Sequence, residues 1–113
     1  MAYVFGVGRS IAFYEHLGFT ATNSHSPEDG ADPVWAHMDS GNAHLTLAKA
    51  SDPIDPMQQA ILFYLYFENI QAAHTEFKNK GLPVGEIAYP FYCPQGEFRL
   101  TDPDGYCLML THV

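Results

Sequence analysis

The stretch "GEFRLTDPDGYCLML", residues 96–110, decides the fold of this chain. Apolar side chains alternate with other residues in two short runs, first at Phe98 and Leu100 and then at Leu108 and Leu110. Because successive side chains of a strand point to opposite faces, each run predicts a strand with one apolar face. The Asp-Pro-Asp-Gly segment between the runs favours a tight turn. The sequence therefore predicts two strands around a turn at the end of the chain.

Outward from this stretch, the same order of elements occurs twice. Apolar residues at helical spacing followed by glycine predict a helix at residues 8–18, and the motif "NIQAAHTEFKNKG" predicts a second helix at residues 69–81 that is opened by Asn69 as a cap. Alternating apolar residues and turn signals predict strands at residues 1–5, 19–24, 34–40, 42–49, 61–68, 84–89, 97–101 and 106–112.

This repetition predicts an α+β fold made of two βαβββ modules. The first module covers residues 1–50 and the second covers residues 61–113, with the proline-containing segment 51–60 as the linker between them. At 113 residues and 47% hydrophobic content, the whole chain is expected to form a single domain, 1–113, that needs no disulfide or structural metal.

Composition limits the partners of the protein. The formal net charge of −8 disfavours nucleic acid and anionic membranes and would attract cationic ligands. The apolar run at residues 60–67 is far shorter than the roughly 20 residues that a membrane span needs. Cys93 and Cys107 form no CxxC motif and are expected to be free thiols that fill a core or a pocket. We therefore expect a cytoplasmic protein.

Alternation along the strands separates an aliphatic face, which should pack under the helices, from a second face rich in Tyr, His, Thr and sulfur. The second face is expected to line the ligand-binding concavity of the sheet. A further segment, residues 89–96, combines two prolines with three aromatic residues and predicts a rigid loop over that concavity. The predicted ligand-binding residues are Trp35, His37, His44, Tyr64, Tyr66, Tyr92, Cys93, Glu97, Arg99, Cys107 and Met109.

Several of these residues have alternative interpretations. Trp35 and His37 share a strand face that suits a planar or cationic guest, but Trp35 can equally seal the core or a dimer edge. His44 can line a pocket or ligate a metal. Glu97 and Arg99, two positions apart on one strand, are expected to form an ion pair, and the alternative is that each contacts a ligand separately.

The motifs "SIAFYEHLGF", "GNAHLTL" and "GEFRLTDPDGYCLML" resemble the vicinal oxygen chelate superfamily, which includes glyoxalase I, ring-cleaving dioxygenases and bleomycin resistance proteins. The resemblance covers nearly the whole chain. It implies paired βαβββ modules that form an open curved sheet around a cleft, and it implies a homodimer. One such fold hosts enzymes and plain binding proteins, so the resemblance by itself does not define an activity.

In metal-dependent members of this superfamily, ligands come from the first and last strands of each module. The first of the corresponding positions falls before Met1, and the others are His44, a position near Leu62, and Met109. Leucine has no donor atom and a thioether is a poor ligand for Zn²⁺, Ni²⁺ or Fe²⁺ in a nitrogen and oxygen site, while a catalytic metal needs about three protein ligands. We therefore expect no metal, no catalytic residues and no cofactor. The alternatives are a register slip that brings in His37, Glu97 or Cys107, and a ligand contributed by a dimer partner.

The resemblance and the charge together favour a small-molecule-binding protein, similar to bleomycin resistance proteins, that sequesters a cationic or aromatic ligand such as an antibiotic without metal chemistry. The first alternative is a metal-dependent glyoxalase-like lyase, isomerase or dioxygenase that uses His44. The second is an accessory subunit with a vestigial pocket.

Overall fold

The computed structural model of the protein describes residues 1–112 and contains two compact units, Met1–Asp55 and Pro56–Val113. Each unit combines one α-helix with one β-sheet, so the predicted α+β class is confirmed. In the described part of the chain, neither helix has the length and apolar character that a membrane span requires.

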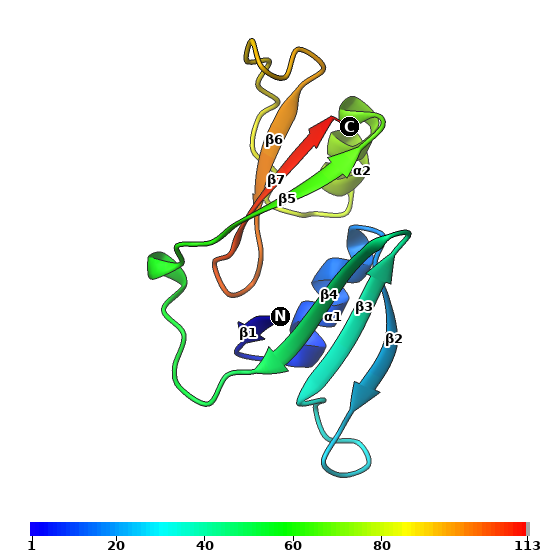
Figure 1. The fold of residues 1–113 in the computed structure, drawn as a ribbon, viewed down its shortest axis with the longest axis vertical. Coiled ribbons are helices and arrows are strands. Elements are labelled where there is room, and N and C mark those ends of the chain that lie inside the picture. The colour runs from blue at the N-terminus through cyan, green and yellow to red at the C-terminus, as the bar shows by residue number, and fades with distance from the viewer. Residues whose placement is uncertain (113) are drawn as a thin grey trace. The chain divides into compact units, whose positions relative to one another are not determined.

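The first unit is a four-stranded sheet with one helix packed against it (Figure 1). Its strands lie in the order β1-β4-β3-β2, with β1 parallel to β4 and the other neighbours antiparallel. Its elements are β1 (Ala2–Val4), α1 (Val7–His16), β2 (Thr20–His25), β3 (Trp35–Ser40) and β4 (Ala43–Lys49). These elements follow the predicted order of strand, helix and three strands.

The core of this unit lies between α1 and one face of the sheet. Val7 and Tyr14 on the helix are buried, as are Ala36 and Met38 on β3 and Leu47 on β4. Burial of a large apolar side chain contributes about 1.5–3 kcal/mol, so this layer holds the helix on the sheet. Residues that alternate with these, His37 and Thr46 among them, lie on the opposite face of the sheet, which α1 does not cover.

Specific hydrogen bonds stabilise the start and the end of α1. At its start, where Gly6 offers no side-chain cap, the carboxylate of Asp32, in the loop between β2 and β3, accepts hydrogen bonds from the Gly8 N–H at 3.2 and 3.4 Å. At its end, Gly18 adopts φ 99°, a left-handed conformation that suits glycine, and the Phe19 N–H donates to the Tyr14 carbonyl at 3.1 Å. The predicted glycine stop is therefore confirmed.

The second unit is a three-stranded sheet with strand order β5-β7-β6 (Figure 1). Its elements are the short 3₁₀ helix η1 (Pro56–Gln58), β5 (Leu62–Phe67), α2 (Ile70–Asn79), β6 (Glu97–Thr101) and β7 (Cys107–His112). The Asn69 side chain accepts a hydrogen bond from the Ala72 N–H at 2.9 Å, so its predicted role as the cap of α2 is confirmed. Phe98, Leu100, Leu108 and Leu110 are buried and form the apolar face that the closing hairpin predicts.

The turn between β6 and β7 is fixed by its own side chain. Asp102 Oδ1 accepts hydrogen bonds from the backbone N–H groups of Asp104 and Tyr106, both at 2.9 Å. Gly105 adopts φ 84°, and a Cβ atom there would lie 2.1 Å from the carbonyl oxygen of Pro56. Glycine is thus required both by the backbone conformation and by the close approach of η1.

The strand predicted at residues 84–89 is wrong as a regular strand. The segment makes only two isolated antiparallel bridges to β6, Val84 with Leu100 and Ala88 with Glu97. Three residues separate the bridges on this segment but only two separate them on β6. The extra residue interrupts the ladder in the manner of a β-bulge.

Candidate functional site

One face of the second sheet gathers six of the predicted ligand-binding residues. The strand register places them in rows across β5, β7 and β6, and residues in one row lie on the same side of the sheet. The rows are Tyr66, Thr111 and Glu97; Tyr64, Met109 and Arg99; and Leu62, Cys107 and Thr101.

The outer edge of this face is aromatic and open to solvent. Tyr64 and Tyr66 on β5 are 51% and 64% exposed, and their rings stack with centroids 6.4 Å apart and an interplanar angle of 26°. Aromatic rings offer large apolar area and a face that attracts cations, and each tyrosine adds a hydroxyl group. These two side chains therefore form a surface suited to an aromatic or cationic guest.

The loop at residues 89–96 folds back onto the same face. The Tyr92 hydroxyl donates a hydrogen bond to Glu97 Oε1 at 3.1 Å, while the Tyr92 side chain stays 68% exposed. Cys93 is buried, and its Sγ lies 3.1 Å from Thr111 Oγ1 and 3.3 Å from the carbonyl oxygen of Gly96. Of the two predicted loop contacts, Tyr92 is presented to solvent and Cys93 anchors the loop.

The contact with Glu97 changes the acidity of Tyr92. The hydrogen bond to the carboxylate, followed by repulsion between that negative charge and a phenolate, raises the pKa of Tyr92 above its ordinary value. Tyr92 thus stays a neutral hydrogen-bond donor throughout the physiological pH range.

The expected ion pair between Glu97 and Arg99 is wrong. Glu97 is only 5% exposed and its carboxylate meets Tyr92, whereas Arg99 is exposed and its Nη1 approaches Cys107 Sγ on β7 at 3.9 Å. The physical reason is that the loop at residues 89–96 brings the Tyr92 hydroxyl group to Glu97, and Tyr92 is a closer partner than Arg99 two positions along the strand. Within residues 1–112, no cationic side chain pairs with Glu97.

A pocket of 330 Å³ opens beside these residues. Its walls come from β6, β7, the loop and the segment that bridges to β6, and they comprise Gly85, Glu86, Ala88, Tyr92, Glu97, Phe98, Arg99 and Met109. Two carboxylates, one guanidinium group and two aromatic residues line the same pocket, so it can accept a cationic donor and an apolar ring together.

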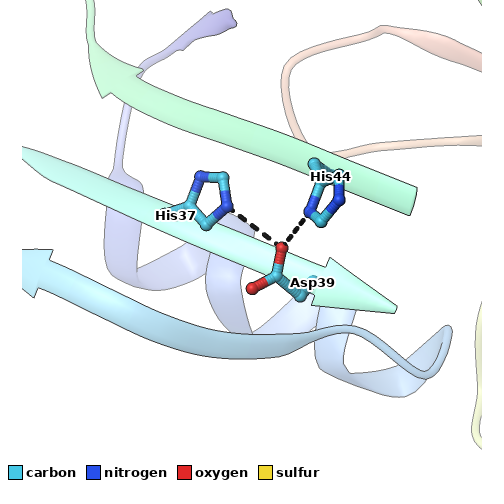
Figure 2. Close-up of side chains that lie close together, drawn as sticks. All are labelled: His37, Asp39 and His44. Atoms are coloured by element: carbon cyan, nitrogen blue, oxygen red, sulfur yellow. Dashed lines mark hydrogen bonds and ion pairs between the residues drawn. The ribbon is translucent and has the colours of Figure 1, made fainter. Parts of the chain in front are cut away.

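A separate polar cluster lies on the first unit, on the face of the sheet that α1 leaves uncovered. Figure 2 shows His37 and Asp39 from β3 and His44 from β4 converging on one carboxylate oxygen. His37 Nε2 lies 3.0 Å from Asp39 Oδ1, and His44 Nδ1 contacts the same oxygen. The two imidazole rings stack with centroids 5.8 Å apart.

Asp39 is the residue of this cluster that sequence reasoning missed. Its spacing of two from His37 and its position in the turn "DSGN" are visible in the sequence, but the pairing of Asp39 with His44 depends on the register of β3 and β4. Hydrogen bonds from His44 and then from Thr22, with added attraction to His37 and His44, lower the pKa of Asp39 despite partial burial. Asp39 is therefore a carboxylate near neutral pH. Trp35, half-buried, lies on the same face of β3.

On the second unit, the residues at the positions that bear metal ligands in metal-dependent members cannot ligate a metal ion. Leu62 and Met109 lie on the sheet face described above, where neither offers a nitrogen or oxygen donor. On the first unit, His44 provides an imidazole.

Each of the two βαβββ-like units has one helix on a sheet whose opposite face carries polar and aromatic side chains. This arrangement defines a small α+β protein of the glyoxalase and bleomycin resistance class. A profile of the Glyoxalase/Bleomycin resistance protein/Dioxygenase superfamily matches residues 1–110, and the chain belongs to this superfamily. No curated protein matches the chain in sequence.

Solved structures show the same fold. A bleomycin-binding protein complexed with bleomycin has a TM-score of 0.77 and 19% identity over 100% of this chain and 98% of its own. A bleomycin resistance determinant encoded on transposon Tn5 has a TM-score of 0.77 and 20% identity over 96% and 90% of the two chains. TnmS3, an antibiotic-binding protein from Streptomyces sp. CB03234, has a TM-score of 0.75 and 18% identity over 98% and 89%.

Proposed function

We propose that the protein binds and sequesters a cationic small molecule with an aromatic or planar part, and that the polar and aromatic face of the second sheet is its binding surface. The observation that carries this proposal is a nearly buried carboxylate, Glu97, which has no cationic partner within residues 1–112 and lies beside exposed tyrosine rings.

Glu97 supplies the charge for such binding. A buried carboxylate is costly unless it is hydrogen-bonded or paired, and the hydroxyl group of Tyr92 occupies only part of its capacity to accept hydrogen bonds. A cationic ligand group in the 330 Å³ pocket would pair with Glu97 in a partly desolvated site. The net charge of −8 would add long-range attraction for the same ligand.

The tyrosines supply contact area for the rest of the ligand. Tyr64, Tyr66 and Tyr92 expose more than half of their surface, and exposed aromatic side chains that cluster on one face are typical of an interaction surface. Stacking on these rings would bury apolar area at a small cost in side-chain entropy.

The structural relatives support the choice of probe. Two of them carry bleomycin in their names and a third is an antibiotic-binding protein, so an antibiotic of the bleomycin type is the first ligand to test. We also propose that binding involves no metal chemistry, because Leu62 and Met109 stand where metal-dependent relatives would have ligands.

We propose further that the protein is a cytoplasmic homodimer. Two free cysteines suit a reducing compartment, and exposed apolar side chains such as Ile61 and Leu62 at the start of the edge strand β5 offer a surface for a second copy. Sedimentation equilibrium tests the assembly: a mass of twice the chain supports it, and a monomer at all concentrations contradicts it.

The proposal is tested by calorimetric titration of the chelator-treated protein with metal-free bleomycin, followed by other cationic aromatic antibiotics. We expect one ligand per chain. Glu97→Gln should bind at least about tenfold more weakly, because it loses the ion pair with the ligand; a tenfold loss of affinity corresponds to about 1.4 kcal/mol. Glu15→Gln, an exposed acid on α1, is the matched control and should bind normally. Absence of binding across the whole panel, or equal binding by both variants, contradicts the proposal.

A further inference from the structure

Three side chains of the types that can ligate a metal ion converge on the first unit, outside the binding surface proposed above. One donor atom from each of His37, Asp39 and His44 lies within 4.8 Å of the other two, on the sheet face opposite α1 (Figure 2). We propose that these three residues form a binding site for a divalent transition-metal ion such as Zn²⁺.

The spacing of the donors fits a single ion. Zinc binds imidazole nitrogen and carboxylate oxygen at about 2.0–2.2 Å, so two tetrahedral ligands lie about 3.4 Å apart. The distance from His37 Nε2 to Asp39 Oδ1 is 3.0 Å, and His44 Nδ1 also lies against that oxygen. Since His37 and His44 are partly exposed, small rotations of their side chains can bring all three donors onto one ion.

Neighbouring hydroxyl groups already hold two of these ligands in place. The Thr46 hydroxyl lies 3.2 Å from His37 Nδ1, which leaves Nε2 directed toward Asp39. The Thr22 hydroxyl donates to Asp39 Oδ2 at 2.8 Å, which leaves Oδ1 directed toward the histidines. Metal sites in proteins typically have such partners on the far atoms of their ligands, where they fix ring orientation and tautomer.

The backbone explains why the four groups meet. The register of β3 and β4 pairs Asp39 with His44 and His37 with Thr46, so all four side chains share one face. On the other side of β3, the ladder with β2 is irregular between Ala21 and Asn23, and this irregularity brings Thr22 to Asp39. The site therefore depends on adjacent strands of one unit.

The donor set selects the class of ion. Two imidazoles and one carboxylate suit Zn²⁺, Ni²⁺, Co²⁺ or Cu²⁺ rather than Ca²⁺ or Mg²⁺, which prefer oxygen ligands only. Three protein ligands leave coordination positions for water or for a donor atom of a small molecule. The inference is independent of the proposed ligand binding, which concerns Glu97 and the tyrosines of the other unit and is measured in chelator-treated protein.

The site is tested by calorimetric titration of the chelator-treated protein with Zn²⁺, and by the visible spectrum of the Co²⁺-loaded protein. We expect one ion per chain and a Co²⁺ spectrum of low coordination number. His44→Ala and Asp39→Asn should each weaken binding at least about tenfold, and Thr22→Val should weaken it about tenfold because it frees Asp39 Oδ2. Asp39→Asn preserves the shape of the side chain, so it guards against simple unfolding.

His25→Ala is the matched control, because His25 is an exposed histidine on the neighbouring strand β2. It should leave the stoichiometry, the affinity and the Co²⁺ spectrum unchanged. No stoichiometric Zn²⁺ binding by the wild-type protein would overturn the inference. So would binding that survives both His44→Ala and Asp39→Asn, or that His25→Ala weakens equally.

Discussion

The hydroxyl group of Tyr92 donates a hydrogen bond to Oε1 of Glu97 at 3.1 Å, and this contact joins an exposed loop residue to a nearly buried carboxylate on β6. The loop at residues 89–96 is held at a second point by Cys93 Sγ, which contacts Thr111 Oγ1 on β7. A ligand in the neighbouring pocket would thus meet a wall fixed at two points, and a fixed wall loses little conformational entropy on binding.

This contact predicts how Tyr92 titrates. Glu97→Gln should lower the pKa of Tyr92 toward its ordinary value of about 10, because the neutral amide no longer repels a phenolate. Because the folded protein raises this pKa, the contribution of Tyr92 to stability is present below about pH 10 and is lost as the pH rises through the folded-state pKa.

The measurement is ultraviolet difference titration of the tyrosines, with Tyr92→Phe identifying which transition belongs to Tyr92. An unchanged Tyr92 transition in Glu97→Gln would show that the hydrogen bond does not govern its acidity.

Tyr66→Ala is expected to weaken binding of the cationic ligand by about tenfold or more, because it removes an exposed ring that stacks with Tyr64 on the proposed surface. Met57→Ala, which removes an exposed apolar side chain from η1, should have little effect. Calorimetry compares the two variants, and equal losses would remove Tyr66 from the site.

Asp32→Ala should lower the free energy of unfolding by about 1 kcal/mol, because the substitution removes the carboxylate that accepts hydrogen bonds at the start of α1. Asp29→Ala, an exposed acid of the same loop, should change stability by less than about 0.5 kcal/mol. Urea denaturation measures both variants, and similar midpoints would show that Asp32 does not cap the helix.

The pattern of the sequence was sufficient for most of the fold. Alternation at Phe98, Leu100, Leu108 and Leu110 predicted the buried face of the closing hairpin, because a strand with one buried face must alternate. The segment 84–89 was predicted as a strand because its residues suit one, but the extra residue between its two bridges cannot be seen in a local pattern.

The sites were less predictable, since they depend on contacts between segments. His37 and His44 could be named individually, yet Asp39 joins them only through the register of β3 and β4. Likewise, the spacing of Glu97 and Arg99 indicated an ion pair, while the loop that brings Tyr92 to Glu97 decided otherwise. A single sequence gives little information on which side chain, distant along the chain, will form a hydrogen bond or an ion pair with a given charged group.

The central claim, that the second sheet binds a cationic small molecule, is tested most directly by following backbone amide signals of isotope-labelled protein during titration with metal-free bleomycin. We predict saturable shifts concentrated on β5, β6, β7 and residues 84–96, with much smaller shifts in Glu97→Gln at the same ligand concentration. An absence of shifts at saturating ligand, or shifts confined to residues of the first unit, would contradict the claim.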